Sequence, residues 1–131
     1  MLEYFYLDVA YRYLQASQAC IDRNVQEPAG FLTYHSFESA GGALCEANSV
    51  NYPRNHKRKL NQFVVIANRL GHGREVGNLP IRLISLRNQF LYPEVLSDGS
   101  IKAPKDVITL TQSQTLRKRV KGIFDWIVMS I

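Results

Sequence analysis

The sequence predicts an all-α protein, a single domain over residues 1–131 that forms a bundle of about five helices. Apolar residues recur at three- and four-residue intervals in five segments, which is the spacing of amphipathic helices. No segment shows convincing alternation of apolar and polar residues, as half-buried strands do. The length suits one domain with its own core, and 46% hydrophobic and 21% charged residues are ordinary for a globular protein.

The first predicted helix covers residues 2–24, where an apolar stripe that includes Leu7 and Leu14 alternates with charged side chains. The second follows Pro28, which suits a first helical turn, and covers residues 29–48. We expect these two helices to be joined by a short turn.

The middle of the second helix contains Gly41 and Gly42. Each glycine costs about 1 kcal/mol relative to alanine inside a helix. Small side chains on one face let another helix approach closely, so we predict close packing at this point rather than a break in the helix.

The remaining helices are predicted over residues 54–70, 79–92 and 111–131. The second of these stops before Pro93, because the residue before a proline disfavours the helical conformation. The last opens with Thr111 and Gln114 at capping-box spacing. The segments GHGREVGNLP and SDGSIKAPKD are predicted to be turns, and the first lacks the Gly-Lys-Ser/Thr ending of a phosphate-binding loop.

The charge of the chain is unevenly distributed. The net charge is +5, but residues 1–53 carry six acidic and two basic side chains, whereas residues 54–131 carry five acidic and fourteen basic ones. Such a split lets the basic half bind a polyanion, or lets an acidic helix pair lie against basic helices. The sequence leaves both interpretations open.

Two basic clusters lie early in their predicted helices. The first cluster is Arg54, Lys57, Arg58 and Lys59, and the second cluster is Arg117, Lys118, Arg119 and Lys121. A helix N-terminus carries a partial positive charge, so each cation there is unfavourable by about 0.3 kcal/mol. Helix stability therefore does not explain the first cluster, whereas binding of nucleic-acid phosphates or salt bridges to the acidic helices would.

The histidines and cysteines show no catalytic or metal-binding spacing. His35 lies on the apolar side of its helix, where a core histidine is more common than a catalytic one, while His56 belongs with the first basic cluster and His72 with a turn. Cys20 and Cys45 form no Cys-x-x-Cys pair and no zinc-ligand pattern. We predict free thiols in a reducing compartment, no metal and no cofactor.

The N-terminal segment MLEYFYLDVAYRYL contains Glu3 and Asp8 and lacks a basic start, so it does not resemble a signal peptide. No run approaches the roughly 18 uncharged apolar residues that a membrane-spanning helix requires. We therefore expect a cytoplasmic protein without membrane attachment.

The fourth predicted helix, RLISLRNQFLYPE, contains the pair Arg87 and Asn88 one turn before its end. Together with FLTYHSFESAGGALCEA and NHKRKLNQF in the preceding helices, residues 28–92 resemble the HEPN superfamily. The resemblance implies a small helical bundle, usually a homodimer that forms through the helices carrying the Arg-Asn pair, so that this pair lies at the dimer interface. Many members are metal-independent endoribonucleases, notably toxins paired with a nucleotidyltransferase antitoxin. Their hallmark is an arginine, often followed by asparagine, and a histidine a few residues later.

Arg87 and Asn88 match the first two positions of this motif, but Tyr92 stands at the histidine position. Metal-free RNA cleavage needs a base for the 2′-hydroxyl proton, and a tyrosine with the ordinary pKa of about 10 is not a base at pH 7. The resemblance implies that Arg87 holds a phosphate of RNA or of a nucleotide and that Asn88 positions it. In an active enzyme, Tyr92 or a histidine such as His35 would shuttle protons.

Two alternatives to this site stay open. Arg87 and Asn88 would serve a structural role if they bonded to main-chain carbonyls near the helix end or to a carboxylate such as Glu38. The protein would be a non-catalytic module if it served as the partner of a nucleotidyltransferase or of another toxin-antitoxin component.

Overall fold

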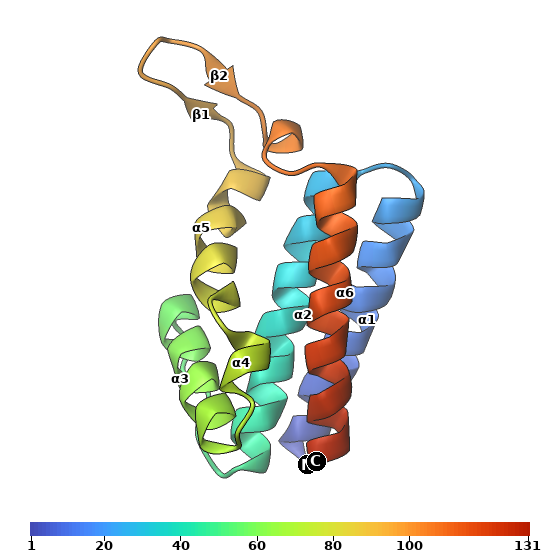
Figure 1. Cartoon of the computed structure of the whole chain (residues 1–131), viewed down its shortest axis with the longest axis vertical. Coiled ribbons are helices and arrows are strands. Elements are labelled where there is room, and N and C mark those ends of the chain that lie inside the picture. Colours follow the sequence, from blue (N-terminus) through green and yellow to red (C-terminus); the bar gives the residue numbers. More distant parts are fainter.

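The computed structural model describes all 131 residues and consists almost entirely of helices (Figure 1). The elements follow in the order α1 (Leu2–Asp22), α2 (Gln26–Ala47), α3 (His56–Arg69), α4 (Gly73–Val76), α5 (Leu79–Leu91), β1 (Glu94–Val95), β2 (Ile101–Lys102), the 3-10 helix η1 (Pro104–Asp106) and α6 (Leu110–Ser130). Five of the helices are long, and α4 is a single turn. The predicted all-α bundle of about five helices is confirmed.

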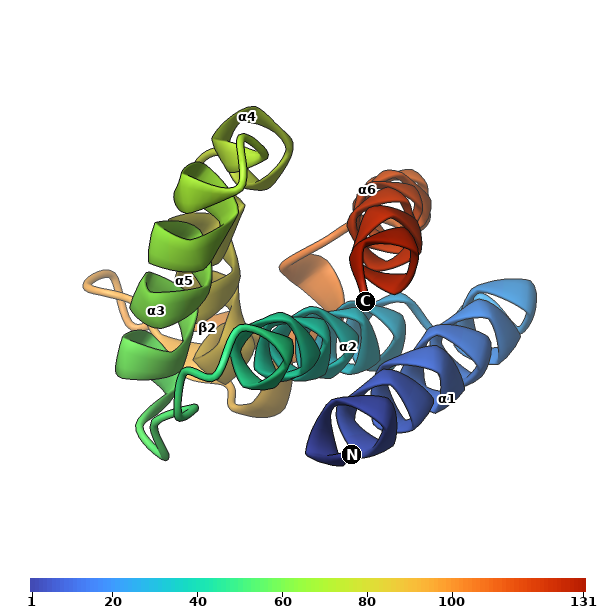
Figure 2. The ribbon, with the colours of Figure 1, turned by 90° about the horizontal axis from the view of Figure 1, so that it is seen from below.

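Helix α2 is the central helix of the bundle. In the view from below, α1 and α6 lie on one side of it and α3 and α5 on the other (Figure 2). Fourteen of its 22 residues are buried, which is why its apolar residues do not form one narrow stripe. Hydrogen bonds from small polar side chains connect α1 to α2. The hydroxyl of Ser17 on α1 donates to the main-chain oxygen of Ala29 at 2.9 Å, and the hydroxyl of Ser36 on α2 donates to the main-chain oxygen of Ala10 at 2.8 Å.

The two glycines in the middle of α2 permit close packing, as predicted, and the helix continues through them without a break. A Cβ atom on Gly41 would lie 2.5 Å from the ring of Phe63 and 2.9 Å from the hydroxyl of Tyr52. One on Gly42 would lie 2.8 Å from the ring of Tyr6. The groups that approach are aromatic side chains rather than the backbone of another helix.

Helix α6 begins earlier than predicted, and its capping box is a different one. The hydroxyl of Thr109 accepts from the backbone N–H of Gln112 at 3.0 Å, and the Gln112 side chain accepts from the N–H of Thr109 at 2.9 Å. The predicted box of Thr111 and Gln114 is wrong. The Thr-x-x-Gln spacing occurs twice, and the earlier copy lets Ser113 bond to the main-chain oxygen of Gln26 at 3.0 Å.

The two segments predicted as turns contain short elements. Helix α4 lies between α3 and α5, and strands β1 and β2 form an antiparallel hairpin in which Glu94 pairs with Lys102. Gly99 takes a positive φ of +84° in the turn of this hairpin. The hairpin extends beyond one end of the bundle, whereas both chain termini lie at the other end (Figure 1).

The cysteines are free thiols, with Cys45 buried and Cys20 partly buried. Burial raises the pKa of the Cys45 thiol to about 12.

None of the helices combines the length and the apolar character that a membrane crossing requires.

Candidate functional site

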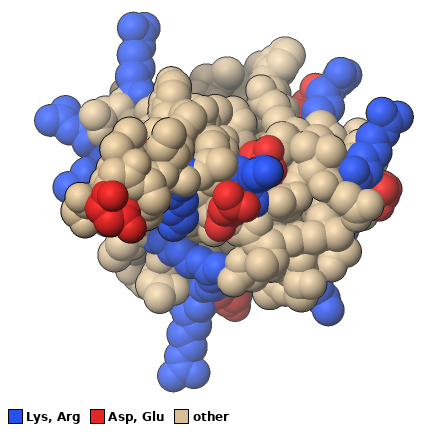
Figure 3. Space-filling view, turned by 90° about the horizontal axis from the view of Figure 1, so that it is seen from above, with Lys and Arg blue, Asp and Glu red and all other residues tan.

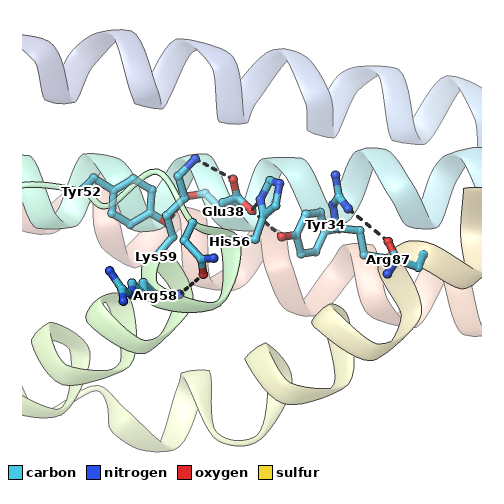
Figure 4. A network of polar contacts seen from close by, with 9 residues as sticks. Tyr34, Glu38, Tyr52, His56, Arg58, Lys59 and Arg87 are labelled. Carbon is cyan, nitrogen blue, oxygen red and sulfur yellow. Dashed lines mark hydrogen bonds and ion pairs between the residues drawn. The ribbon is translucent and has the colours of Figure 1, made fainter.

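A buried carboxylate, Glu38, lies at the centre of a polar network between α2 and α3 (Figure 4). Its side chain is only 8% exposed. One carboxylate oxygen accepts hydrogen bonds from the hydroxyl of Tyr34 and, at 2.8 Å, from Nδ1 of His56, and the other accepts from Nζ of Lys59 at 3.0 Å. The hydroxyl of Tyr52 donates to the main-chain oxygen of Glu38 at 2.6 Å. These donors offset the cost of burying a charged group.

Helical spacing explains why these side chains meet. Tyr34 and Glu38 are four residues apart on α2, and His56 and Lys59 are three residues apart in the first turn of α3, so each pair shares one helix face. Asn55 caps α3, because its side chain accepts from the backbone N–H of Arg58 at 3.1 Å. The cap fixes where α3 begins and so directs His56 toward α2.

The network keeps Glu38 ionised. Burial by itself would raise the pKa of this carboxyl, but the hydrogen bonds from Tyr34, His56 and Lys59 outweigh burial and hold the pKa below its ordinary value. Burial, with the hydrogen bond to Glu38 and its charge, raises the pKa of the Tyr34 hydroxyl far above its ordinary value. Tyr34 is therefore a hydrogen-bond donor at neutral pH, and Glu38 is an acceptor.

His35 packs among aromatic side chains. Its ring centre lies 4.5 Å from that of Phe31 and 5.7 Å from that of Tyr13. Burial is the main cause of the lowered pKa of His35, and the positive charge of Arg87 contributes to it. This placement agrees with the interpretation of His35 as a core histidine.

Arg87 of α5 lies next to Tyr34 (Figure 4). The central carbon of its guanidinium group is 5.9 Å from the centre of the Tyr34 ring, and one terminal nitrogen donates to the side-chain oxygen of Asn88 at 3.2 Å. Its Nε is buried and has no hydrogen-bond partner within the chain. A buried donor without a partner costs free energy, so this atom is a polar group that the fold leaves unsatisfied.

One surface pocket of about 210 Å³ joins the Arg-Asn pair to the start of α3. We call it the Arg87 pocket, and it is lined by Asn55, His56, Lys57, Ile84, Arg87 and Asn88. The His56 side chain is 42% exposed. Since its Nδ1 bonds to Glu38, its Nε2 is the nitrogen left for a bound molecule. The pocket therefore offers several nitrogen donors and a histidine that a carboxylate orients.

The structure brings together only some of the predicted site residues. Of the first basic cluster, Lys57 lines the Arg87 pocket, Lys59 pairs with Glu38, and Arg54 and Arg58 are exposed. Tyr92 lies outside the pocket, where it is 64% exposed and lines a neighbouring hollow with Asn88, Gln89, Pro93 and Glu94.

The second basic cluster makes contacts of its own on α6. Arg117 donates to the main-chain oxygen of Leu14 at 3.0 Å, Arg119 donates to that of Val76 at 3.2 Å, and Lys121 pairs with Asp125 at 2.9 Å, while Lys118 is exposed. None of the four lines the Arg87 pocket. Seen from the end that carries the hairpin, Lys and Arg side chains project from several sides and do not gather in one patch (Figure 3).

Sequence reasoning missed the roles of His56 and Glu38. Glu38 was considered as a partner of Arg87, but its partners are Tyr34, His56 and Lys59, and Arg87 bonds to Asn88 instead. The local spacings on α2 and α3 were visible in the sequence. The contact between the two helices was not.

No protein-family model, no curated protein and no solved structure matches this chain. No group of three or more His, Cys, Asp or Glu side chains lies in position to hold a metal ion.

Proposed function

We propose that this protein is an HEPN-like domain that binds RNA or a nucleotide through phosphate contacts in the Arg87 pocket. The observation that carries the proposal is the guanidinium of Arg87, which forms no salt bridge, has an Nε without a partner within the chain, and lines the pocket beside the donors of Lys57 and Asn88. A phosphate group has several acceptor oxygens, and a planar guanidinium can bind two of them at once. A phosphate in this pocket would pair with the charge of Arg87, which no carboxylate of the chain neutralises.

The surroundings of the pocket favour a polymer over a single nucleotide. Arg54 and Arg58 are exposed close to His56 in the sequence and form no salt bridge. Additional cations beside a phosphate site bind neighbouring phosphates of a strand, and each such contact makes the affinity more sensitive to salt. Single-stranded RNA supplies these phosphates at a regular spacing.

A second candidate function, metal-independent endoribonuclease, is favoured by the pairing of Glu38 with His56. A carboxylate on Nδ1 orients the imidazole and leaves Nε2 to accept the 2′-hydroxyl proton. The 2′-oxygen would attack the adjacent phosphorus and form a 2′,3′-cyclic phosphate. The 5′-oxygen would leave with a proton from solvent, and Arg87 would stabilise the charge on the pentacoordinate phosphorus. His56 thus replaces the motif histidine in this proposal.

Binding of a labelled single-stranded RNA at several salt concentrations tests the first function. We expect Arg87→Ala to weaken binding by about tenfold, or about 1.4 kcal/mol, and to lower the salt slope by about 0.7 for each lost phosphate contact. Arg82→Ala is the matched control, because Arg82 is exposed on the same helix but does not line the Arg87 pocket. Equal effects of the two substitutions would refute the assignment.

Cleavage in the presence of EDTA tests the second function in the same samples. We expect His56→Ala to abolish cleavage and to weaken RNA binding much less than Arg87→Ala does. Cleavage that persists in His56→Ala would exclude His56 as the base.

The homodimer that the resemblance implies stays a prediction, which light scattering after gel filtration tests.

A further inference from the structure

The Arg87 pocket continues into an apolar groove between α3 and α5. The part next to the pocket has a volume of about 120 Å³ and shares Lys57 and Ile84 with it, and its other lining residues are Leu60, Asn61, Pro80 and Ile81. The next part, of about 340 Å³, is lined by Asn61, Val64, Val65, Gly77, Pro80 and Ile81. Because neighbouring hollows share lining residues, they lie side by side along α3 and α5, with a cationic end at the Arg87 pocket and an apolar end, and we call the two apolar hollows the groove.

The walls of this groove leave apolar surface in contact with water. Ile81 is 77% exposed and Val65 is 48% exposed. Single exposed aliphatic side chains are ordinary, but several of them along one groove beside a charged pocket are typical of a ligand site.

One amide side chain interrupts the apolar walls. Asn61 is exposed on α3 and lines both parts of the groove, and its side chain makes no hydrogen bond within the chain. An amide presents a donor and an acceptor side by side. The groove thus combines apolar surfaces with one amide whose donor and acceptor are free of partners within the chain.

We propose that this groove is the base-binding subsite of the Arg87 pocket. The nucleobase next to the phosphate held by Arg87 lies between α3 and α5 against Pro80, Ile81 and Ile84, and Asn61 forms hydrogen bonds with the polar edge of the base. The proposal rests on the proposed function and names the part of the RNA that occupies the groove.

The chemistry of a nucleobase matches the groove. A base has two apolar faces and an edge of donors and acceptors, and single-stranded RNA is recognised through unstacked bases whose edges form hydrogen bonds with the protein. A base and its phosphate belong to one nucleotide, and the shared lining residues Lys57 and Ile84 place the two subsites side by side. Asn61 is then a residue that determines base preference, whereas Arg87 binds every nucleotide alike.

Fluorescence anisotropy with oligomers of equal length tests this inference. The probes are oligoadenylate, oligocytidylate, oligouridylate and an abasic ribose-phosphate oligomer, which carry the same charge, so the phosphate contribution is matched. We expect the protein to bind at least one base-containing oligomer about tenfold more tightly than the abasic one, a difference of about 1.4 kcal/mol. Asn61→Ala should reduce this preference several-fold and leave abasic binding unchanged.

Two further variants sharpen the test. Asn68→Ala is the control, because Asn68 is exposed on the same helix, lies two turns further along and lines neither part of the groove. Ile81→Ser removes part of the apolar wall at a position that is already 77% exposed, so the fold should tolerate it. We expect the control to bind like the original protein and Ile81→Ser to lose much of the preference for bases.

The outcomes separate this inference from the proposed function. Equal binding of abasic and base-containing oligomers, all dependent on Arg87, would overturn the base subsite and leave the phosphate site standing. Binding that does not depend on Arg87 would overturn the proposed function itself. A dimer that Ile81→Ser dissociates without changing base preference would show that a second copy of the chain covers the groove, and the base subsite would be wrong.

Discussion

Replacing Glu38 by glutamine removes the charge around which Tyr34, His56 and Lys59 are arranged. The glutamine amide keeps one acceptor oxygen, but its NH2 group replaces the second carboxylate oxygen and so faces a donor instead of accepting from it. A hydrogen bond to a charged group contributes about 1.5–3 kcal/mol, and breaking a buried ion pair costs about 3–5 kcal/mol. His56 is 42% exposed and Lys59 is 23% exposed, so both can turn toward water. We therefore expect Glu38→Gln to lower the free energy of unfolding by about 2–3 kcal/mol.

The pH dependence of this loss has a definite sign. The pKa of Glu38 in the folded protein is lower than its ordinary value of 4.5. The stabilisation by the carboxylate is therefore fully present above the pKa of the unfolded chain and is lost as pH falls through the lower folded pKa. Urea denaturation followed by circular dichroism, from about pH 5.5 downward, should show the two proteins converging in stability as Glu38 becomes protonated.

Glu46→Gln is the matched control. Glu46 lies on the same helix about two turns further along and forms no salt bridge, so its replacement should change stability by less than about 0.5 kcal/mol. Two results would contradict the idea that the network holds Glu38 as a carboxylate. One is that Glu38→Gln is as stable as the original protein at pH 5.5. The other is that the difference in the free energy of unfolding between the two proteins stays the same at the lowest pH measured.

Two other predictions concern the helices. Gly41→Ala should destabilise the protein by about 1–2 kcal/mol, because overpacking against an aromatic ring 2.5 Å away outweighs the gain in helix propensity. A Cβ atom added at Gly122 would have no neighbour within 4 Å, so Gly122→Ala should stabilise the protein by up to about 1 kcal/mol. Urea denaturation in which Gly41→Ala is the more stable variant would contradict the packing at Gly41. Thr109→Ala should lower the free energy of unfolding by about 1 kcal/mol and Thr111→Ala by less than about 0.5 kcal/mol, because only Thr109 caps α6. Equal shifts of the melting temperature for the two variants would contradict this cap.

The helices were predictable because their signals are local. Apolar spacing in each long helix, Pro93 after α5 and the small residues within α2 are visible within one or two turns of sequence. The hairpin was not predictable in this way, since each strand has two residues and Val95 and Ile101 are both exposed. The capping box failed because two overlapping copies of one spacing compete, and burial of neighbouring side chains selects between them.

The candidate site was predictable only in part, because it depends on contacts between distant segments. Arg87 and Asn88 are adjacent in sequence and form a recognisable pair. His56 lies 31 residues before Arg87 and reaches the same pocket only because α3 and α5 pack beside each other. A motif defined by spacing after the arginine cannot detect a histidine from a preceding helix. Tyr92 was chosen by spacing, and the structure places it outside the pocket.

The first basic cluster illustrates how the fold separates two explanations that the sequence left open. Lys59, together with His56, binds Glu38, and this carboxylate lies at the first turn of α3, where negative charge is favourable. Lys59 is therefore explained by one of these two interpretations, a salt bridge from the basic cluster to an acidic helix. Arg54, Lys57 and Arg58 are exposed and have no carboxylate partner, although cations at a helix N-terminus are unfavourable. Neither salt bridges nor helix stability accounts for these three cations, so they are the members of the cluster that the proposed RNA binding would use, and the salt dependence of RNA binding tests that proposal directly.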